Sequence, residues 1–100
     1  MKYSNYQECI KHITELSEFR SNSLHGEWGV DGFYVISYRT VIGFISTDRS
    51  SAYVNAEKYS VTTSKHQTYL RQALRALQEQ YPHLNVVEHV YGIKVEKVTA

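Results

Sequence analysis

The sequence predicts an α+β domain: an antiparallel sheet of four to five strands with two helices packed on one face, in the order α-β-β-β-(β)-α-β. Two amphipathic helical patterns are separated along the chain, and runs rich in β-branched and aromatic residues lie between them and after the second. Short connections between the middle runs favour an antiparallel meander with helices on one side. At 100 residues the chain can bury one modest core, so we expect a single domain over residues 1–100.

The first helix is predicted from about Tyr6 to Arg20. Ser4 and Gln7 fit a capping box, and apolar residues then recur at three- and four-residue spacing. Cys9 falls on this apolar stripe, so we interpret it as a small buried hydrophobe. It is the only cysteine, which excludes an intrachain disulfide and a cysteine-based zinc site.

A loop and then a meander are predicted between the two helices. Ser21 to Gly32 is rich in serine and glycine and predicts a loop, whose Trp28 we expect to fold back over the edge of the core. Three strands are predicted at Phe33–Tyr38, Val41–Ile45 and Ala52–Asn55. A short fourth strand is predicted at Tyr59–Val61. The sequence between the first two predicts either a tight turn or a bulge.

The second helix has the strongest start and stop signals in the chain. Its apolar periodicity runs from Thr68 to Gln80, and Pro82 ends it. Ser64 begins a capping box, with Thr63 as the rival cap one residue earlier. Beyond this helix, Asn85 to Val98 predicts one or two further strands.

Composition and charge narrow the function classes only broadly. The net charge is +1, but residues 32–75 carry six basic and two acidic side chains, so an anion contact is expected in this part. No stretch has the apolar length of a membrane span or of a signal peptide, so we expect a cytoplasmic protein with no membrane contact. Nine tyrosines are a mild indication of an interface, because their rings pack while their hydroxyls meet water.

Two interpretations fit the polar stretch Tyr59–Gln67 at the entrance of the second helix. Hydroxyl and carboxamide side chains satisfy the free N–H groups of a helix N-terminus, so capping alone explains most of these residue types. Alternatively, the N–H groups, the hydroxyls and the positive helix end could hold a phosphate or carboxylate. The basic residues near this stretch are Lys58, Lys65, Arg71 and Arg75.

A catalytic function is not expected. Ser60 or Ser64 with His66 would supply a nucleophile and a base, and Asn55 could orient the imidazole, but no nucleophile-elbow glycines accompany them. The other histidines lack metal-ligand spacing, and no acidic pair is placed for general acid–base work. We therefore predict no catalytic residue, no metal and no cofactor.

Two blocks of the chain resemble a family of small proteins from bacteriophages and mobile elements. The family pattern is a Ser-Tyr-x-Thr-Pro-Ile strand, an Asn, and a Tyr-Ser-x-Thr-Thr-Ser-x-His-Gln helix entrance; here these are Ser37–Ile42, Asn55 and Tyr59–Gln67. Val41 stands where the family usually has proline. The role of that family is uncharacterised, so the resemblance implies an origin more than an activity. It also implies that Arg39 and Asn55 lie near His66.

Small phage proteins often bind and block host proteins. By this analogy we expect non-covalent binding to a host protein in the host cytoplasm, for example inhibition of a defence system such as CRISPR. The alternative is a nucleic-acid-binding accessory protein that uses the basic face around the second helix. An exposed strand edge could also pair two copies into a homodimer. The predicted binding residues are Arg39, Asn55, Tyr59, Ser64, Lys65, His66, Arg71 and Arg75.

Overall fold

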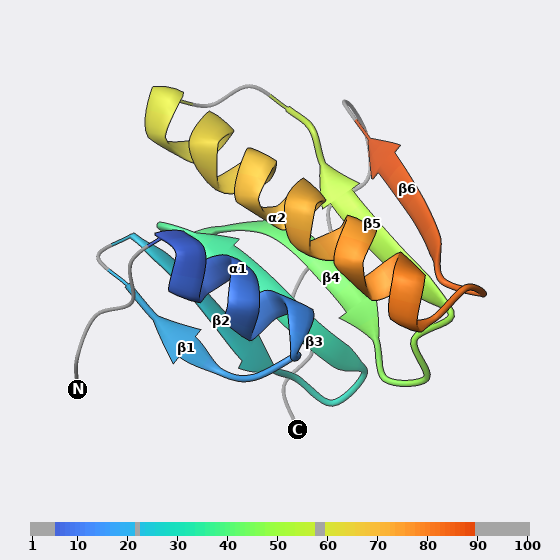
Figure 1. Cartoon of the computed structure of the whole chain (residues 1–100). Helices are drawn as coiled ribbons and strands as arrows, with labels where there is room; N and C mark the ends of the chain where they lie inside the picture. Colours follow the sequence, from blue (N-terminus) through green and yellow to red (C-terminus); the bar gives the residue numbers. More distant parts are fainter. Residues whose placement is uncertain (1–5, 22, 58–59, 90–100) are drawn as a thin grey trace.

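The computed structural model describes residues 6–21, 23–57 and 60–89. Two helices lie on one face of a six-stranded sheet whose strands follow chain order across it (Figure 1). The α+β class is confirmed, but the predicted number of four to five strands is wrong. In chain order the elements are α1 (Tyr6–Thr14), β1 (Phe19–Arg20), β2 (Leu24–Trp28), β3 (Gly32–Ser37), β4 (Thr40–Ser46), β5 (Ser51–Asn55), α2 (Val61–Gln80) and β6 (Asn85–His89).

The sheet is mixed, which corrects the prediction of an antiparallel sheet. Strands β1 to β5 pair antiparallel, whereas β6 pairs parallel with β5 in the register Ser51↔Asn85 to Asn55↔His89. The reason is the connection: α2 carries the chain back along the sheet, so the next strand starts from the same end as β5. The rest of the predicted strand region, from Val90 to Val98, lies outside the described residues.

Helix α1 is shorter than predicted and ends at Thr14. Leu16 adopts a left-handed conformation (φ 54°), its N–H donates to Ile13 O, and the N–H of Ser17 donates to His12 O. These two bonds form a Schellman motif, which closes a helix and usually has glycine at the left-handed position. Because leucine occupies that position here, the sequence carries no stop signal.

Strand β2 lies inside the segment that was predicted to be a loop. Its central residue, Gly26, pairs with Phe19 of β1 and Val35 of β3. A Cβ at Gly26 would lie 2.5 Å from the Phe19 ring and 2.6 Å from the Phe33 ring, so glycine leaves room for both aromatic rings. Trp28, at the end of β2, packs against the core as predicted, and its indole N–H donates to Leu16 O.

The β3–β4 connection is the predicted tight turn, formed by Tyr38 and Arg39. Tyr38 adopts a left-handed conformation with φ 56°. The strands also contain a register shift between Val35 and Ile36, so the turn and a bulge are both present. The turn places exposed side chains directly after the last buried residue of β3.

Helix α2 begins three residues before the predicted cap. Ser60 is the N-cap, and its side chain accepts a hydrogen bond from the N–H of Thr63 at 3.1 Å. The capping box at Ser64 and the short strand ending at Val61 are therefore wrong, because both residues lie in the first turns of the helix. At the other end the helix stops at Gln80, as predicted, immediately before Tyr81 and Pro82.

The main core lies between the helices and the sheet. It is formed by Ile13 of α1, Leu70 and Leu77 of α2, and strand residues such as Val35 and Ile45, all of which are fully buried. Gly43 of β4 lets α2 approach closely, since a Cβ there would lie 2.5 Å from a methyl group of Leu70.

The opposite face of the sheet carries a second apolar cluster. Tyr34, Ile36 and Phe44 are buried there, with Val41 and Tyr53 packed against them. The Tyr34 and Phe44 rings meet edge to face at 4.9 Å. Because its side chains alternate between the two clusters, β3 is buried along its whole length.

Candidate functional site

The buried polar side chains gather where the end of β3 meets the start of α2. Within the described residues these side chains are Ser37, Thr63, His66 and Gln67, each less than a tenth exposed. Ser37 occupies a position of β3 that faces the helices, and the other three lie on the inner side of the first turns of α2. The two blocks of the sequence motif therefore meet in space.

Hydrogen bonds connect these side chains into a chain that we call the hydroxyl–histidine network, formed by Ser23, Ser37, Ser60, Thr63 and His66. The Nδ1 atom of His66 lies 2.7 Å from Ser37 Oγ, and Ser37 Oγ lies 3.1 Å from Thr63 Oγ1. The Ser60 hydroxyl donates to Thr63 Oγ1 at 3.2 Å, and Ser23 Oγ lies 3.4 Å from Nε2 of His66. Both nitrogens of the imidazole thus have partners.

A neutral His66 that carries its proton on Nε2 is compatible with every hydrogen bond of the network. Because Ser60 donates to Thr63, the Thr63 hydroxyl is free to donate to Ser37, and the Ser37 hydroxyl can then donate to Nδ1. The Nε2–H of His66 is left to donate to Ser23. Burial lowers the pKa of His66 below its ordinary value, which favours this neutral form.

Gln67 joins the start of α2 to the end of β5. Its side-chain amide donates to Asn55 O at 2.6 Å and to Glu57 O at 3.0 Å. The Asn55 side chain donates to Val41 O at 3.4 Å and accepts from the N–H of Glu57. The predicted site residue Asn55 therefore helps to fix the corner between β4, β5 and α2.

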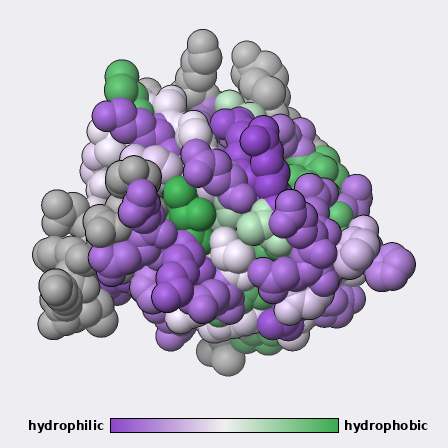
Figure 2. Space-filling model, viewed as in Figure 1, coloured by the Kyte–Doolittle hydropathy of each residue, from purple (hydrophilic) through white to green (hydrophobic). Residues whose placement is uncertain are grey.

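Exposed side chains lie above the network and form what we call the motif surface: Tyr38, Arg39, Val61, Ser64 and Lys65. Tyr38 is 55% exposed and Val61 is 77% exposed. The Tyr38 ring lies 6.3 Å from the His66 ring and is tilted by 44° against it, so the turn lies beside the network. Figure 2 shows apolar colour at the start of α2, and also at the centre and right of this face, among mainly hydrophilic residues.

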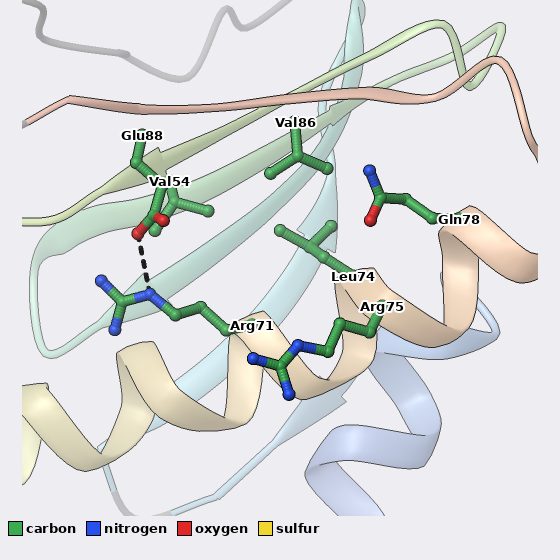
Figure 3. Close-up of a pocket in the computed structure, with 7 residues that line it drawn as sticks. All are labelled: Val54, Arg71, Leu74, Arg75, Gln78, Val86 and Glu88. Carbon is green, nitrogen blue, oxygen red and sulfur yellow. Dashed lines mark hydrogen bonds and ion pairs between the residues drawn. The ribbon is translucent and has the colours of Figure 1, made fainter.

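The predicted site residues Arg71 and Arg75 lie elsewhere, in what we call the α2–β6 groove (Figure 3). The Arg71 Nε–H donates to the Glu88 carboxylate at 2.8 Å. Figure 3 shows the Arg75 guanidinium beside that of Arg71, one helical turn further along. The groove has a volume of about 160 Å³ and is lined by Val54, Arg71, Leu74, Arg75, Gln78, Val86 and Glu88.

The structure thus divides the predicted site residues into two groups. His66 and Asn55 stabilise the corner, and Arg39, Ser64 and Lys65 lie on the motif surface above it, while Arg71 and Arg75 line the groove. Tyr59 lies outside the described residues. The partners that the sequence did not identify for His66 are Ser37 and Ser23. The sequence did contain a signal for Ser37. Every second residue of β3, namely Phe33, Val35 and Ser37, faces the core, and Ser37 is the polar one among them.

The described part of the chain contains no group of three or more histidine, cysteine, aspartate or glutamate side chains that could hold a metal ion. Within the same residues, none of the helices combines the length and apolarity needed to cross a membrane.

The fold and the corner define an α+β domain in which a buried hydroxyl–histidine network supports an exposed turn and helix start. Residues 3–81 match a family described as Family of unknown function (DUF8033), and the chain belongs to that family. The matched range contains both blocks of the sequence motif. Neither the curated proteins nor the solved structures include a match to the chain.

Proposed function

We propose that this protein acts by non-covalent binding of a partner protein through the motif surface. We further propose that it originates from a bacteriophage or mobile element and that the partner is a host protein, such as a component of a defence system like CRISPR. The geometry of the corner supports the binding of a partner protein. The motif resemblance supports the origin and the host partner.

One observation carries the proposal: the motif buries four polar side chains, Ser37, Thr63, His66 and Gln67, while Tyr38 and Val61 next to them stay exposed. Ser37 is 1% exposed and His66 is 7% exposed, so a substrate would not reach the Ser37 hydroxyl. In contrast, Tyr38 and Val61 stand in solvent, although both are next to the network. Buried polar networks hold a surface rigid, and exposed tyrosine and arginine side chains on a rigid surface are typical of binding anchors.

Lys65 and Arg39 give the motif surface a polar rim. Both residues are exposed. Tyrosine and arginine are enriched in protein interfaces, and the rim of an interface is polar, which suits Lys65.

The test is co-purification of the tagged protein from its natural host, followed by binding measurements with the purified partner. We expect one stoichiometric protein partner, and an affinity that falls by at least about tenfold in Tyr38→Asn and in Val61→Ser. Asparagine tolerates the left-handed backbone at position 38, so the fold should be preserved.

Gln72→Ala is the matched control, because Gln72 is exposed on α2 about two helical turns beyond Lys65. Partner binding that survives both motif-surface substitutions would contradict the proposed surface. Recovery of nucleic acid that is lost on nuclease treatment would contradict protein binding and support the alternative function.

A further inference from the structure

Strand β6 has the properties of an edge that pairs with another strand. It is the last strand in the order of the described sheet, and its partner there is β5. An edge strand presents a row of N–H and C=O groups that can form hydrogen bonds with a further strand. Val86 and Glu88 face α2 and line the α2–β6 groove, and Val87 between them points to the other face.

The charges in the groove are not balanced within one chain. Arg71 forms an ion pair with Glu88, whereas Arg75 has no ion pair or hydrogen bond within the described residues. The groove therefore carries one positive charge in excess, and its floor is apolar because Val54, Leu74 and Val86 form it. A carboxylate placed beside Arg75 would complete a second ion pair.

The spacing along α2 and β6 shows where that carboxylate would have to lie. Helix α2 runs antiparallel to β6, so moving forward along α2 means moving backward along β6 (Figure 1). From Arg71 to Arg75 the helix rises about 6 Å, and from Glu88 back to Val86 the strand extends about 6.6 Å. Since Arg71 is level with Glu88, Arg75 is level with Val86.

We propose that β6 pairs antiparallel with β6 of a second copy of this chain, across a two-fold axis through Val87. In this register Val87 lies opposite Val87 of the second copy, and Val86 lies opposite Glu88 of the second copy. Directly opposite residues point to the same face, so the second Glu88 enters the groove beside Arg75. Each copy then has one ion pair within the chain and one across the interface, and the sheet becomes continuous over both copies.

The dimer interface is separate from the motif surface. Val61 and Arg75 are fourteen residues apart on α2, which corresponds to about 21 Å along the helix axis. The dimer would therefore present two motif surfaces at once. It does not depend on the proposed partner-binding function, since it can be measured with the purified protein alone.

Cysteine cross-linking tests the register. Cys9→Ala removes the only native cysteine, and Val87→Cys then places two thiols directly opposite each other across the two-fold axis. We expect rapid formation of a disulfide-linked dimer under mild oxidation, because only directly opposite Cβ atoms come within disulfide range. A mixture of Val86→Cys and Glu88→Cys chains, each in the Cys9→Ala background, should also cross-link, whereas Val86→Cys alone should not.

Lys65→Cys in the same background is the control for random collision, because Lys65 is exposed on the motif surface. Cross-linking of Val87→Cys no faster than this control would overturn the proposal. Cross-linking of Val86→Cys alone, faster than the mixture, would overturn the register and with it the proposed ion pair.

The charge argument has its own test by light scattering coupled to size-exclusion chromatography. We expect the native chain to elute with twice the chain mass, and Arg75→Glu to weaken dimerisation by at least about tenfold, because it opposes the carboxylate of the second copy. Arg39→Glu makes the same charge change on the motif surface and should leave the dimer unchanged. If Arg75→Glu is not folded by circular dichroism, Arg75→Gln replaces it. A native chain that is still monomeric at its highest soluble concentration, with the same mass as after a 100-fold dilution, would overturn the proposal.

Discussion

His66 is the residue at which folding and protonation are most directly coupled. Its Nδ1 lies 2.7 Å from the Ser37 hydroxyl and its side chain is buried, so adding a proton would charge a buried group and make both ring nitrogens donors. Burial lowers the pKa of His66 in the folded protein. In the unfolded chain the imidazole titrates at its ordinary pKa of about 6.5.

The sign of the resulting pH dependence follows from this difference. Above the unfolded pKa both states are neutral, and stability does not depend on His66. As the pH falls below about 6.5, the unfolded chain takes up a proton that the folded chain does not, so the free energy of unfolding decreases. The decrease continues until the pH reaches the lowered pKa of the folded state.

We therefore predict that the free energy of unfolding falls less between pH 7.5 and pH 5.5 in His66→Gln than in the native protein. Urea denaturation at several pH values measures this directly. His83→Gln is the control, because His83 is exposed. Equal slopes for the native protein and His66→Gln would show that His66 is not the coupled group.

At the scale of elements, the start of α2 offers a matched pair of serines. The Ser60 side chain accepts from the Thr63 N–H and donates to Thr63 Oγ1, so it caps the helix and orients the network. Ser64 lies one turn later with its side chain exposed, and its hydroxyl forms no hydrogen bond within the described residues.

We predict that Ser60→Ala lowers the free energy of unfolding by about 1 kcal/mol, the usual effect of losing a cap. Ser64→Ala should change it by less than about 0.5 kcal/mol, since alanine is a good helix former and no partner is lost. Chemical denaturation of both variants under one set of conditions decides between the two serines. If Ser64→Ala lowered the free energy of unfolding more than Ser60→Ala did, the helix cap would be at Ser64, as the sequence predicted.

The elements that the sequence predicted well have side chains that match their local structure. The β3 and β4 runs are β-branched and aromatic, and the apolar stripe of α2 continues through Leu70 and Leu77. The errors arose where a contact distant in sequence decides the structure. Gly26 is in a strand because the Phe19 and Phe33 rings need its space, and Leu16 ends α1 in a conformation that leucine rarely adopts.

For the candidate site, too, the sequence predicted the local features and missed the contacts between residues that are distant in sequence. The motif indicated that Arg39, Asn55 and His66 belong to one region, and His66 is one of the buried residues of α2. Its partners could not be predicted, because Ser23 and Ser37 are 43 and 29 residues away from it and meet it only when β2, β3 and α2 pack. Spacing along one element identifies which side chains share a face, but not what they meet.

At the scale of the whole molecule, the position of the basic residues separates the two classes of partner. Arg39 and Lys65 lie on the motif surface, and Arg71 and Arg75 lie in the groove, where Glu88 neutralises one charge. Arg49 is held near the opposite ends of the strands, 5.7 Å from the Trp28 ring and 5.9 Å from the Tyr81 ring. In the part of the chain that the structure describes, each of these three regions holds at most two of the named cations, fewer than the six to ten phosphate contacts of a strongly salt-dependent DNA-binding protein.

We therefore predict only weak, non-specific binding to duplex DNA and to single-stranded RNA, with a Kd no tighter than roughly 10⁻⁴ M at physiological salt. Fluorescence anisotropy with labelled oligonucleotides at 50 mM and 200 mM salt measures both the affinity and its salt dependence. A protein that makes six to ten phosphate contacts would lose roughly a thousandfold or more in affinity between these two conditions. Tight binding with such a loss, abolished by Arg71→Ala together with Arg75→Ala, would replace protein binding with the nucleic-acid function and make the α2–β6 groove its site.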